Sequence, residues 1–394
     1  MSSSTSTADN GGFALDTATL ARYLGRIGWP GSPSDLARDV QRAPLTTLRA
    51  LLEQHCLAVP FENLDQHGHP AAAPSHPAIV RHNVWEHPTR VGVRRAVQKL
   101  VDYRRGGFCF EGNLAFCWLL RQFYGDVRLS LAQSHNPTNP ELWNVPSHVV
   151  LLVRPETLSS SSIAPQPCHS ADAGTHWEAS RRQDLAGTNP GEYFLVDPFW
   201  GDTPRAVLSL RVDVTGRCRI GDQWRVRSTI DAEADESWGA DAGGVAGSRF
   251  SHVLLRRRVR GVNARGDFTG AEFATHSQGD LAQWEPQYRF AIDDALPYDA
   301  AEFQVGFKFV LTDPSSWFTK QPIITMATKG GYKTLTKSKL KRTINGMATY
   351  TPVESEAHWR QLLQEEYKVV LTERREYEGA TANSGVGGNS SARL

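Results

Sequence analysis

The spacing of hydrophobic residues changes near Gly125, and this change limits the folds that the chain can adopt. Before Gly125, hydrophobic residues recur every three or four positions, as in Tyr23, Leu24 and Ile27, which is the period of a helix with one buried face. After Gly125, short segments such as "SHVVLLVR" and "EYFLVDPF" have the composition of β-strands. Helices and strands that occupy separate parts of a chain indicate an α+β protein.

The length of the chain predicts more than one hydrophobic core, because 394 residues exceed what a single core usually serves. The strand segments predict a barrel or a strongly twisted sheet, and a mixture of strands and a helix near the C-terminus predicts a small α/β cap. Segments in which Ser, Ala, Gly and Asp displace the hydrophobic residues predict solvated insertions and termini. The expected organisation is a disordered N-terminus at 1–14, a helical bundle at 15–125, a β-barrel at 126–275 with insertions at about 159–190 and 231–247, an α/β lid at 276–375 and a flexible tail at 376–394.

The balance of charges argues against nucleic acid or an anionic membrane as a partner. Lys and Arg number 43 against 42 Asp and Glu, so the formal net charge of +1 gives the chain no overall field. No apolar run approaches the ~20 residues that span a bilayer, and the first residues, "MSSSTSTADNGG", lack a basic start and an apolar core. We therefore expect a soluble, unexported, cytoplasmic protein whose partners are small molecules or proteins.

The cysteines argue against both a disulfide framework and a zinc site. Their number is odd, they are widely spaced, and none forms a CxxC pair, which is typical of a reducing compartment. No GxxxxGK loop is present, so a nucleoside triphosphate is not indicated. The five cysteines are Cys56, Cys109, Cys117, Cys168 and Cys218.

Cys109 lies in the segment "RRGGFCFEGNLAFCWLL", after two glycines and before a helix that is apolar almost all round. Backbone N–H groups and the dipole at a helix N-terminus favour an anion, so the thiolate form of Cys109 should be stabilised. The alternative is that Cys109 is a small buried hydrophobic residue, as Cys117 in the middle of the same helix is expected to be.

A nucleophilic thiol needs a base, and the base needs a group that orients it. His148 and His252 begin apolar strands in near-identical contexts, "SHVVLLV" and "SHVLLRRR". Only His148 is followed by a strand that ends in an acid, because Asp197 comes directly after three hydrophobic residues in "YFLVDPFWG". This order favours Cys109, His148 and Asp197 as a triad, although Asp197 alone could equally be part of an Asp-Pro turn.

Several motifs resemble those of the arylamine N-acetyltransferases. The family signature RGGxCxExN stands here at 105–113, and "YLGRIG" at 23–28 and "PFENL" at 60–64 are similar to two further landmarks of the family. The strands that bear His148 and Asp197 follow in the family's order, and "DPSSWFTKQPIITMAT" and "LLQEEYKVVL" resemble parts of its third domain. The resemblance implies an α+β fold with the arrangement of papain-like thiol enzymes: a helical bundle, a central β-barrel and a C-terminal α/β lid.

The same resemblance implies a ping-pong acyl transfer from acyl-CoA to the nitrogen of an arylamine, arylhydrazine or arylhydroxylamine, with a role in xenobiotic detoxification. Cys109 would be the nucleophile, His148 the base, and Asp197 the group that orients His148. Acyl-CoA would be a co-substrate, and no permanent cofactor, metal or obligatory protein partner is implied. The donor stays open among acetyl-, propionyl- and malonyl-CoA.

Four aromatic residues, Phe61, Phe108, Phe199 and Trp200, are candidates to line an aromatic acceptor pocket, with packing in the core as the alternative. A lysine-rich stretch at 329–342 and the arginines at 256–260 are candidates to bind the phosphates of coenzyme A, with exposed edge strands as the alternative.

The sequence departs from the family in two ways. His148 and Asp197 are separated by a long insertion, and "PFWG" follows the acid.

Two other classes of protein remain open. A thiol peptidase or a transglutaminase-like enzyme would use the same Cys, His, Asp order, and a non-catalytic binding protein for acyl-CoA or arylamine would need no triad.

The C-terminal tripeptide Ala392-Arg393-Leu394 resembles a peroxisomal targeting signal, with a chance tripeptide on a cytosolic enzyme as the alternative.

Overall fold

A computed structural model describes the helical and strand-forming parts of the chain. The described residues are 16–67, 90–135, 143–157, 191–201, 205–211, 215–217, 223–228, 250–257, 284–292, 301–344 and 347–371. The expected disordered N-terminus, the two insertions and the tail lie outside them, as do Cys168, Cys218 and the C-terminal tripeptide.

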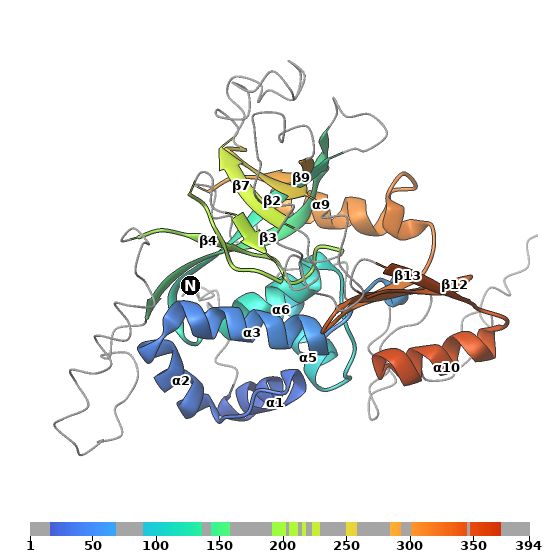
Figure 1. Ribbon diagram of the computed structural model, residues 1–394, viewed down its shortest axis with the longest axis horizontal. Coiled ribbons are helices and arrows are strands. Elements are labelled where there is room, and N and C mark those ends of the chain that lie inside the picture. Colours follow the sequence, from blue (N-terminus) through green and yellow to red (C-terminus); the bar gives the residue numbers. More distant parts are fainter. Residues whose placement is uncertain are drawn as a thin grey trace, which may run out of the picture.

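The first part of the chain is a bundle of helices, in which α6 packs against both α5 and the barrel (Figure 1). Every residue of α6 from Cys109 to Leu120 is buried except Glu111, as its apolar composition predicts. The first helix is capped at its N-terminus by Asp16, whose side chain accepts the N–H of Thr19 at 2.8 Å, and at its C-terminus by Gly28 with φ 73°. The helices are α1 (Thr17–Ile27), α2 (Pro33–Arg42), α3 (Pro44–Ala58), α5 (Arg90–Val101) and α6 (Cys109–Arg121).

The second part is an antiparallel sheet of eight strands, curved so that its ends approach each other. The strand order is β5-β4-β3-β2-β9-β8-β7-β6, and β5 also contacts β6 and β7, so the sheet is nearly a closed barrel. The strands are β2 (Tyr124–His135), β3 (Trp143–Thr157), β4 (Phe194–Val196), β5 (Leu208–Ser209), β6 (Thr215–Arg217), β7 (Gln223–Ser228), β8 (His252–Arg257) and β9 (Glu285–Phe290).

The predicted end of the barrel at residue 275 is wrong, because β9 pairs with both β2 and β8 inside this sheet. The barrel therefore continues to Phe290. β9 is close in the sequence to the lid, and only its pairing with strands far away in the sequence assigns it to the barrel.

The third part is a five-stranded antiparallel sheet covered on one face by α10. Its order is β1-β10-β11-β12-β13, so that β1, from the N-terminal part of the chain, forms one edge. In Figure 1 this sheet and α10 lie to one side of the helices and the barrel. Its elements are β1 (Phe61–Glu62), η1 (Leu64–His67), η5 (Trp317–Thr319), β10 (Ile323–Thr328), β11 (Gly331–Thr336), β12 (Lys339–Ile344), β13 (Met347–Pro352) and α10 (Glu356–Tyr367). Helix α9 (Ala301–Thr312) packs instead against β3 of the barrel and against η5.

The predicted α+β fold, with a helical bundle, a β-barrel and an α/β lid, is confirmed. Within the described part of the chain, no helix combines the length and the apolar composition needed to cross a membrane.

Candidate active site

The thiol of Cys109 lies at the N-terminus of α6, where the chain turns sharply after two glycines. A Cβ atom on Gly106 would lie 1.9 Å from the carbonyl oxygen of Pro60, so only glycine fits there. The N–H of Glu62 donates to Gly107 at 2.9 Å and fixes the turn against β1. Cys109 is 1% exposed, and its Sγ lies 3.8 Å from the carbonyl oxygen of Ser147, next to His148.

His148 and Asp197 meet because their strands pair, although the long insertion separates them in the sequence. Leu151 of β3 is opposite Val196 of β4, and Nε2 of His148 lies 2.7 Å from Oδ2 of Asp197. Both side chains are buried. Burial disfavours the imidazolium of His148, but the negative charges of Asp197 and Cys109 and hydrogen bonds to both outweigh it and raise the pKa of His148 to about 10. The site thus holds a charged imidazole between the carboxylate of Asp197 and the sulfur of Cys109.

Three further donors hold the carboxylate of Asp197. The hydroxyl of Tyr288 donates to Oδ2 at 2.9 Å, Nδ2 of Asn113 donates to Oδ1 at 3.1 Å, and the N–H of Phe199 donates to Oδ1 at 3.2 Å. Burial, and secondarily the charge of Asp197, raise the pKa of Tyr288 well above its ordinary value, so its hydroxyl stays protonated as a donor. Sequence analysis missed both side chains as partners of Asp197.

A sequence signal for one of these partners exists. Asn113 follows Cys109 by four positions on one helix, so it lies on the same face, and its role could have been found from that spacing. Tyr288 lies in β9, and no local pattern connects it to Asp197.

His252 lies away from this group. His252 pairs with Phe290, Phe290 with Ala132, and Ala132 with His148, so three strand spacings of about 4.8 Å separate the two histidines. Nδ1 of His252 contacts Oγ of Ser251 at 2.9 Å. The structure therefore brings His148, and not His252, to Cys109 and Asp197.

The four predicted aromatic residues take different positions. Phe199 is 1% exposed, and a Cβ on Gly112 would lie 2.2 Å from its ring, so it packs in the core against α6. Phe61 and Phe108 lie beside Phe318 and Phe307, with ring centroids 5.7 and 5.6 Å apart respectively. Trp200 is only partly buried, and its ring lies 4.8 Å from that of His148 and 4.9 Å from that of Tyr288.

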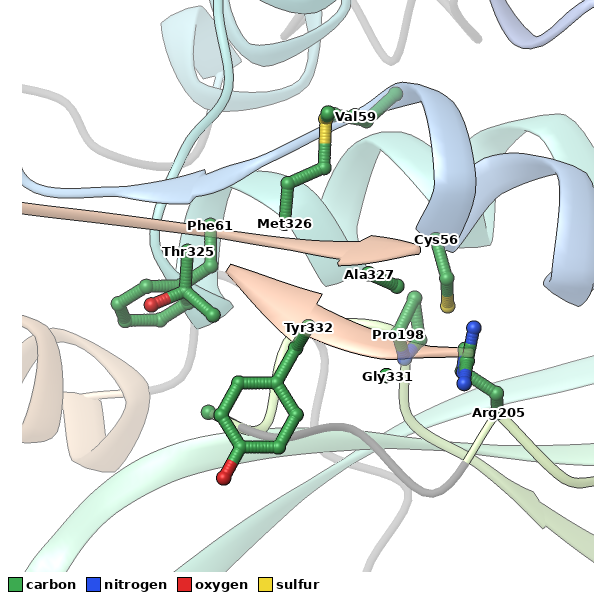
Figure 2. A pocket seen from close by; sticks show the side chains of 11 residues that line it. Cys56, Val59, Phe61, Pro198, Arg205, Thr325, Met326, Ala327, Gly331 and Tyr332 are labelled. Carbon is green, nitrogen blue, oxygen red and sulfur yellow. The ribbon is translucent and has the colours of Figure 1, made fainter. Parts of the chain in front are cut away.

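An open pocket lies beside the turn that follows Asp197, between the end of α3 and strands β10 and β11 (Figure 2). Phe61, Pro198, Arg205, Thr325 and Tyr332 contribute to its lining. Nη1 of Arg205 donates to the carbonyl oxygen of Thr328, whereas its buried Nη2 has no hydrogen-bond partner in the part of the chain that the structure describes. The pocket thus combines an apolar wall with an incompletely satisfied cation.

Most of the predicted phosphate-binding cations have other contacts. Lys333 and Arg342 pair with Glu366 of α10, and Lys337 pairs with Glu356. The amines of Lys339 and Lys341 lie 5.3 and 5.8 Å from the ring centres of Tyr350 and Tyr332. Arg256 is buried with its guanidinium 5.1 Å from the ring centre of Trp224, and the residues from Arg258 to Arg260 lie outside the described residues. No set of three or more His, Cys, Asp or Glu side chains suited to a metal ion occurs in the described segments.

Comparison with known proteins is consistent with this geometry. The sequence matches the N-acetyltransferase family over residues 44–157 and 256–376. It is 26% identical over 134 residues to the liver isozyme of arylamine N-acetyltransferase from Gallus gallus, and 31% identical over 140 residues to arylamine N-acetyltransferase from Escherichia coli (strain K12). These alignments cover 34% and 36% of this chain and 38% and 41% of the two relatives, so the chain aligns with less than half of their length.

The fold is also shared with solved structures. The structure of Mycobacterium marinum arylamine N-acetyltransferase in complex with CoA superposes with a TM-score of 0.56 at 19% sequence identity, over 89% of this chain and 92% of that chain. Since the family match extends over more than half of the sequence and includes Cys109 and His148, the chain belongs to the arylamine N-acetyltransferase family.

Proposed function

We propose that the protein transfers an acyl group from acyl-CoA to the nitrogen of an arylamine, arylhydrazine or arylhydroxylamine through an acyl-Cys109 intermediate. The observation that carries this proposal is the contact between His148 and Asp197 at 2.7 Å beside the thiol of Cys109. The CoA bound to the M. marinum relative supports acyl-CoA as the donor.

In the first half-reaction, the thiolate of Cys109 attacks the thioester carbonyl of acyl-CoA. The bond from the carbonyl carbon to the sulfur of CoA breaks, and the imidazolium of His148 gives its proton to the departing thiolate. One thioester replaces another, so the exchange is nearly balanced in free energy. Asp197 holds the imidazole and stabilises its positive charge before this transfer.

In the second half-reaction, the nitrogen of the amine attacks the acyl-Cys109 thioester. Neutral His148 accepts a proton from the nitrogen, the bond to Sγ breaks, and the thiolate of Cys109 forms again beside the imidazolium. CoA leaves before the amine reacts, so the kinetics are ping-pong.

A detoxifying role toward foreign arylamines is the physiological counterpart of this activity. The cysteines that the structure describes, Cys56, Cys109 and Cys117, are all free, which suits a reducing compartment such as the cytoplasm.

Mass spectrometry tests the intermediate. Incubation with acetyl-CoA and no amine should add one acetyl group to the peptide that contains Cys109, and addition of an arylamine should remove it. A peptidase or transglutaminase-like enzyme would release no CoA from acetyl-CoA and would form no N-acetylated amine, and a binding protein would form no adduct. An adduct on another cysteine, or turnover retained in Cys109→Ala, would contradict the mechanism.

The pocket beside the turn after Asp197 supports a finer proposal about the donor. Nη2 of Arg205 has no hydrogen-bond partner among the residues that the structure describes, and both the carboxylate of malonyl-CoA and the phosphates of any CoA could accept its N–H groups. We include malonyl-CoA, with acetyl- and propionyl-CoA, among the donors of this protein. A panel of the three donors with one arylamine measures the preference.

A further inference from the structure

Five charged side chains form a buried cluster below the turn that carries Cys109. Nζ of Lys99 lies 2.9 Å from Asp65, 2.8 Å from Glu111 and 3.6 Å from Glu62. Nη2 of Arg105 lies 3.0 Å from Glu62 and 3.1 Å from Asp65. The side chains of Lys99 and Arg105 are each 2% exposed and that of Glu62 is 0% exposed. Burying so many charges is costly, and a cluster of this kind is weak evidence for added stability.

Glu111 connects the cluster to the backbone next to Cys109. Helix α6 has Phe108 at its N-cap, and a phenylalanine side chain cannot accept the free N–H groups of the first turn. Oε2 of Glu111 instead accepts the N–H of Phe108 at 3.4 Å, while the same oxygen accepts Nζ of Lys99 at 2.8 Å. The residue before Cys109 is thus fixed by a carboxylate, and the carboxylate is fixed by a buried lysine.

The turn has little freedom to adjust if this contact is lost. A Cβ on Gly107 would lie 2.9 Å from Cβ of Glu111, so the Glu111 side chain packs directly over the backbone of the glycine turn. Burial raises the pKa of Glu111 above its ordinary value, and Lys99 acts in the opposite direction, so Lys99 favours the ionised carboxylate. Lys99 of α5 thus contacts both Asp65 of η1 and Glu111 of α6.

We infer that Lys99 and Glu111 are positioning residues that set the direction of the Cys109 thiol toward His148 by anchoring the first turn of α6. This inference rests on the proposed function, because it takes Cys109 as the nucleophile. Neither side chain touches the reacting atoms. Their contribution is the placement of the turn, where an error of about 1 Å costs on the order of a hundredfold in rate.

Two conservative substitutions separate placement from charge. Glu111→Gln keeps the length of the side chain and an oxygen that accepts the N–H of Phe108, but removes the negative charge. Glu111→Asp keeps the charge and is shorter by one methylene, so the carboxylate withdraws from Phe108. The inference predicts that Glu111→Gln acylates Cys109 within about threefold of the original rate, and that Glu111→Asp is slower by about ten- to a hundredfold.

The experiment measures the release of CoA from acetyl-CoA in a single turnover without amine, at several donor concentrations. Lys99→Met should slow the maximal rate to a similar extent as Glu111→Asp, and the double variant should be no slower than either, because both act through one contact. The apparent affinity for acetyl-CoA should not change. Arg22→Met is the matched control, since it removes an exposed ion pair with Asp102 at 3.1 Å in the same bundle, and it should acylate normally.

Each outcome decides the question. A normal rate in Glu111→Asp, or a slow Glu111→Gln, would overturn the placement role, and so would a change confined to donor affinity. If Lys99→Met gives no folded protein, the two Glu111 variants alone carry the test. Failure of the proposed function is distinguishable, because the unsubstituted protein would then release no CoA, whereas iodoacetamide would still report whether Cys109 is accessible and reactive in every variant.

Discussion

Nε2 of His148 lies 2.7 Å from Oδ2 of Asp197, and the pairing of β3 with β4 creates this contact across a long break in the described chain. The two strands are neighbours whatever the length of the chain between them, because extending a loop adds little to the free energy of closing it. The insertion that distinguishes this sequence from the family pattern is therefore compatible with the triad.

The first prediction concerns the choice of histidine. His148→Ala should lower acyl transfer by about 10⁴-fold, because it removes the group that exchanges protons with Cys109 and CoA. His252→Ala should retain most of the activity, because His252 lies three strand spacings away. The two residues have nearly the same neighbours in the sequence, so each variant is the control of the other. Steady-state transfer to one arylamine measures both, and an inactive His252→Ala would show that the triad is wrongly assigned.

The second prediction concerns pH. The imidazolium of His148 gives a proton to departing CoA, and its pKa is raised to about 10, so CoA release in a single turnover should be sustained at neutral pH and fall as pH rises through about 10. The imidazolium contributes to stability in full below the ordinary value of 6.5, and this contribution is lost as pH rises through the raised pKa.

Asp197→Asn provides the control for this assignment. It removes a charge that raises the pKa of His148, so the decline should begin at lower pH. A decline at the same pH in both proteins would show that another group controls it.

The third prediction concerns the donors to Asp197. Tyr288→Phe removes one hydrogen bond of 2.9 Å to the carboxylate and leaves the ring in place, which should slow acylation by about tenfold. If Tyr288 only orients Asp197, CoA release by Tyr288→Phe should fall at the same high pH as it does in the unsubstituted protein. Tyr193→Phe is a comparison on the outside of the site, since its hydroxyl bonds to Asp126, and it should acylate normally. Equal rates in the two variants would contradict the role of Tyr288.

The fourth prediction concerns packing beneath the triad. Gly112→Ala would place a methyl group 2.2 Å from the ring of Phe199, two residues after Asp197. Relief of this overlap must move Phe199 or α6, so we expect a loss of stability of about 1–3 kcal/mol together with slower acylation. Gly25→Ala is a control, because a methyl group there would meet nothing within 4 Å, and its unfolding midpoint in urea should not fall.

The sequence was sufficient for the parts of the site that local patterns encode. A cysteine after two glycines, a histidine in one apolar strand and an acid directly after the next can be found from periodicity and turn chemistry, and the family signature agreed with them. The structure differs in one detail, because β3 begins at Trp143 and His148 lies within it rather than at its start. Contacts between distant segments were not accessible in this way. Tyr288 reaches Asp197 only because β9 closes the barrel, and Lys99 reaches Glu111 only because α5 packs on α6.

Aromatic residues near the triad show the same limit. Phe199 and Trp200 are adjacent in the sequence, yet one ring fills the core against Gly112 and the other lies beside His148. The sequence left each of them open as a pocket-lining residue or as part of the core, and only the direction of each side chain distinguishes them. Trp200 remains the candidate to contact the acceptor, and Phe61 contributes to the neighbouring pocket.

The last prediction concerns Arg205, whose buried Nη2 has no partner among the described residues. Arg205→Gln removes the cation and keeps a donor of similar reach. If Nη2 binds the carboxylate of a malonyl group, transfer from malonyl-CoA should fall by about tenfold or more while transfer from acetyl- and propionyl-CoA is unchanged. If it binds a phosphate of CoA, all three donors should lose affinity together. Equal activity of Arg205→Gln and the unsubstituted protein with every donor would remove Arg205 from the site and leave the pocket to the acceptor.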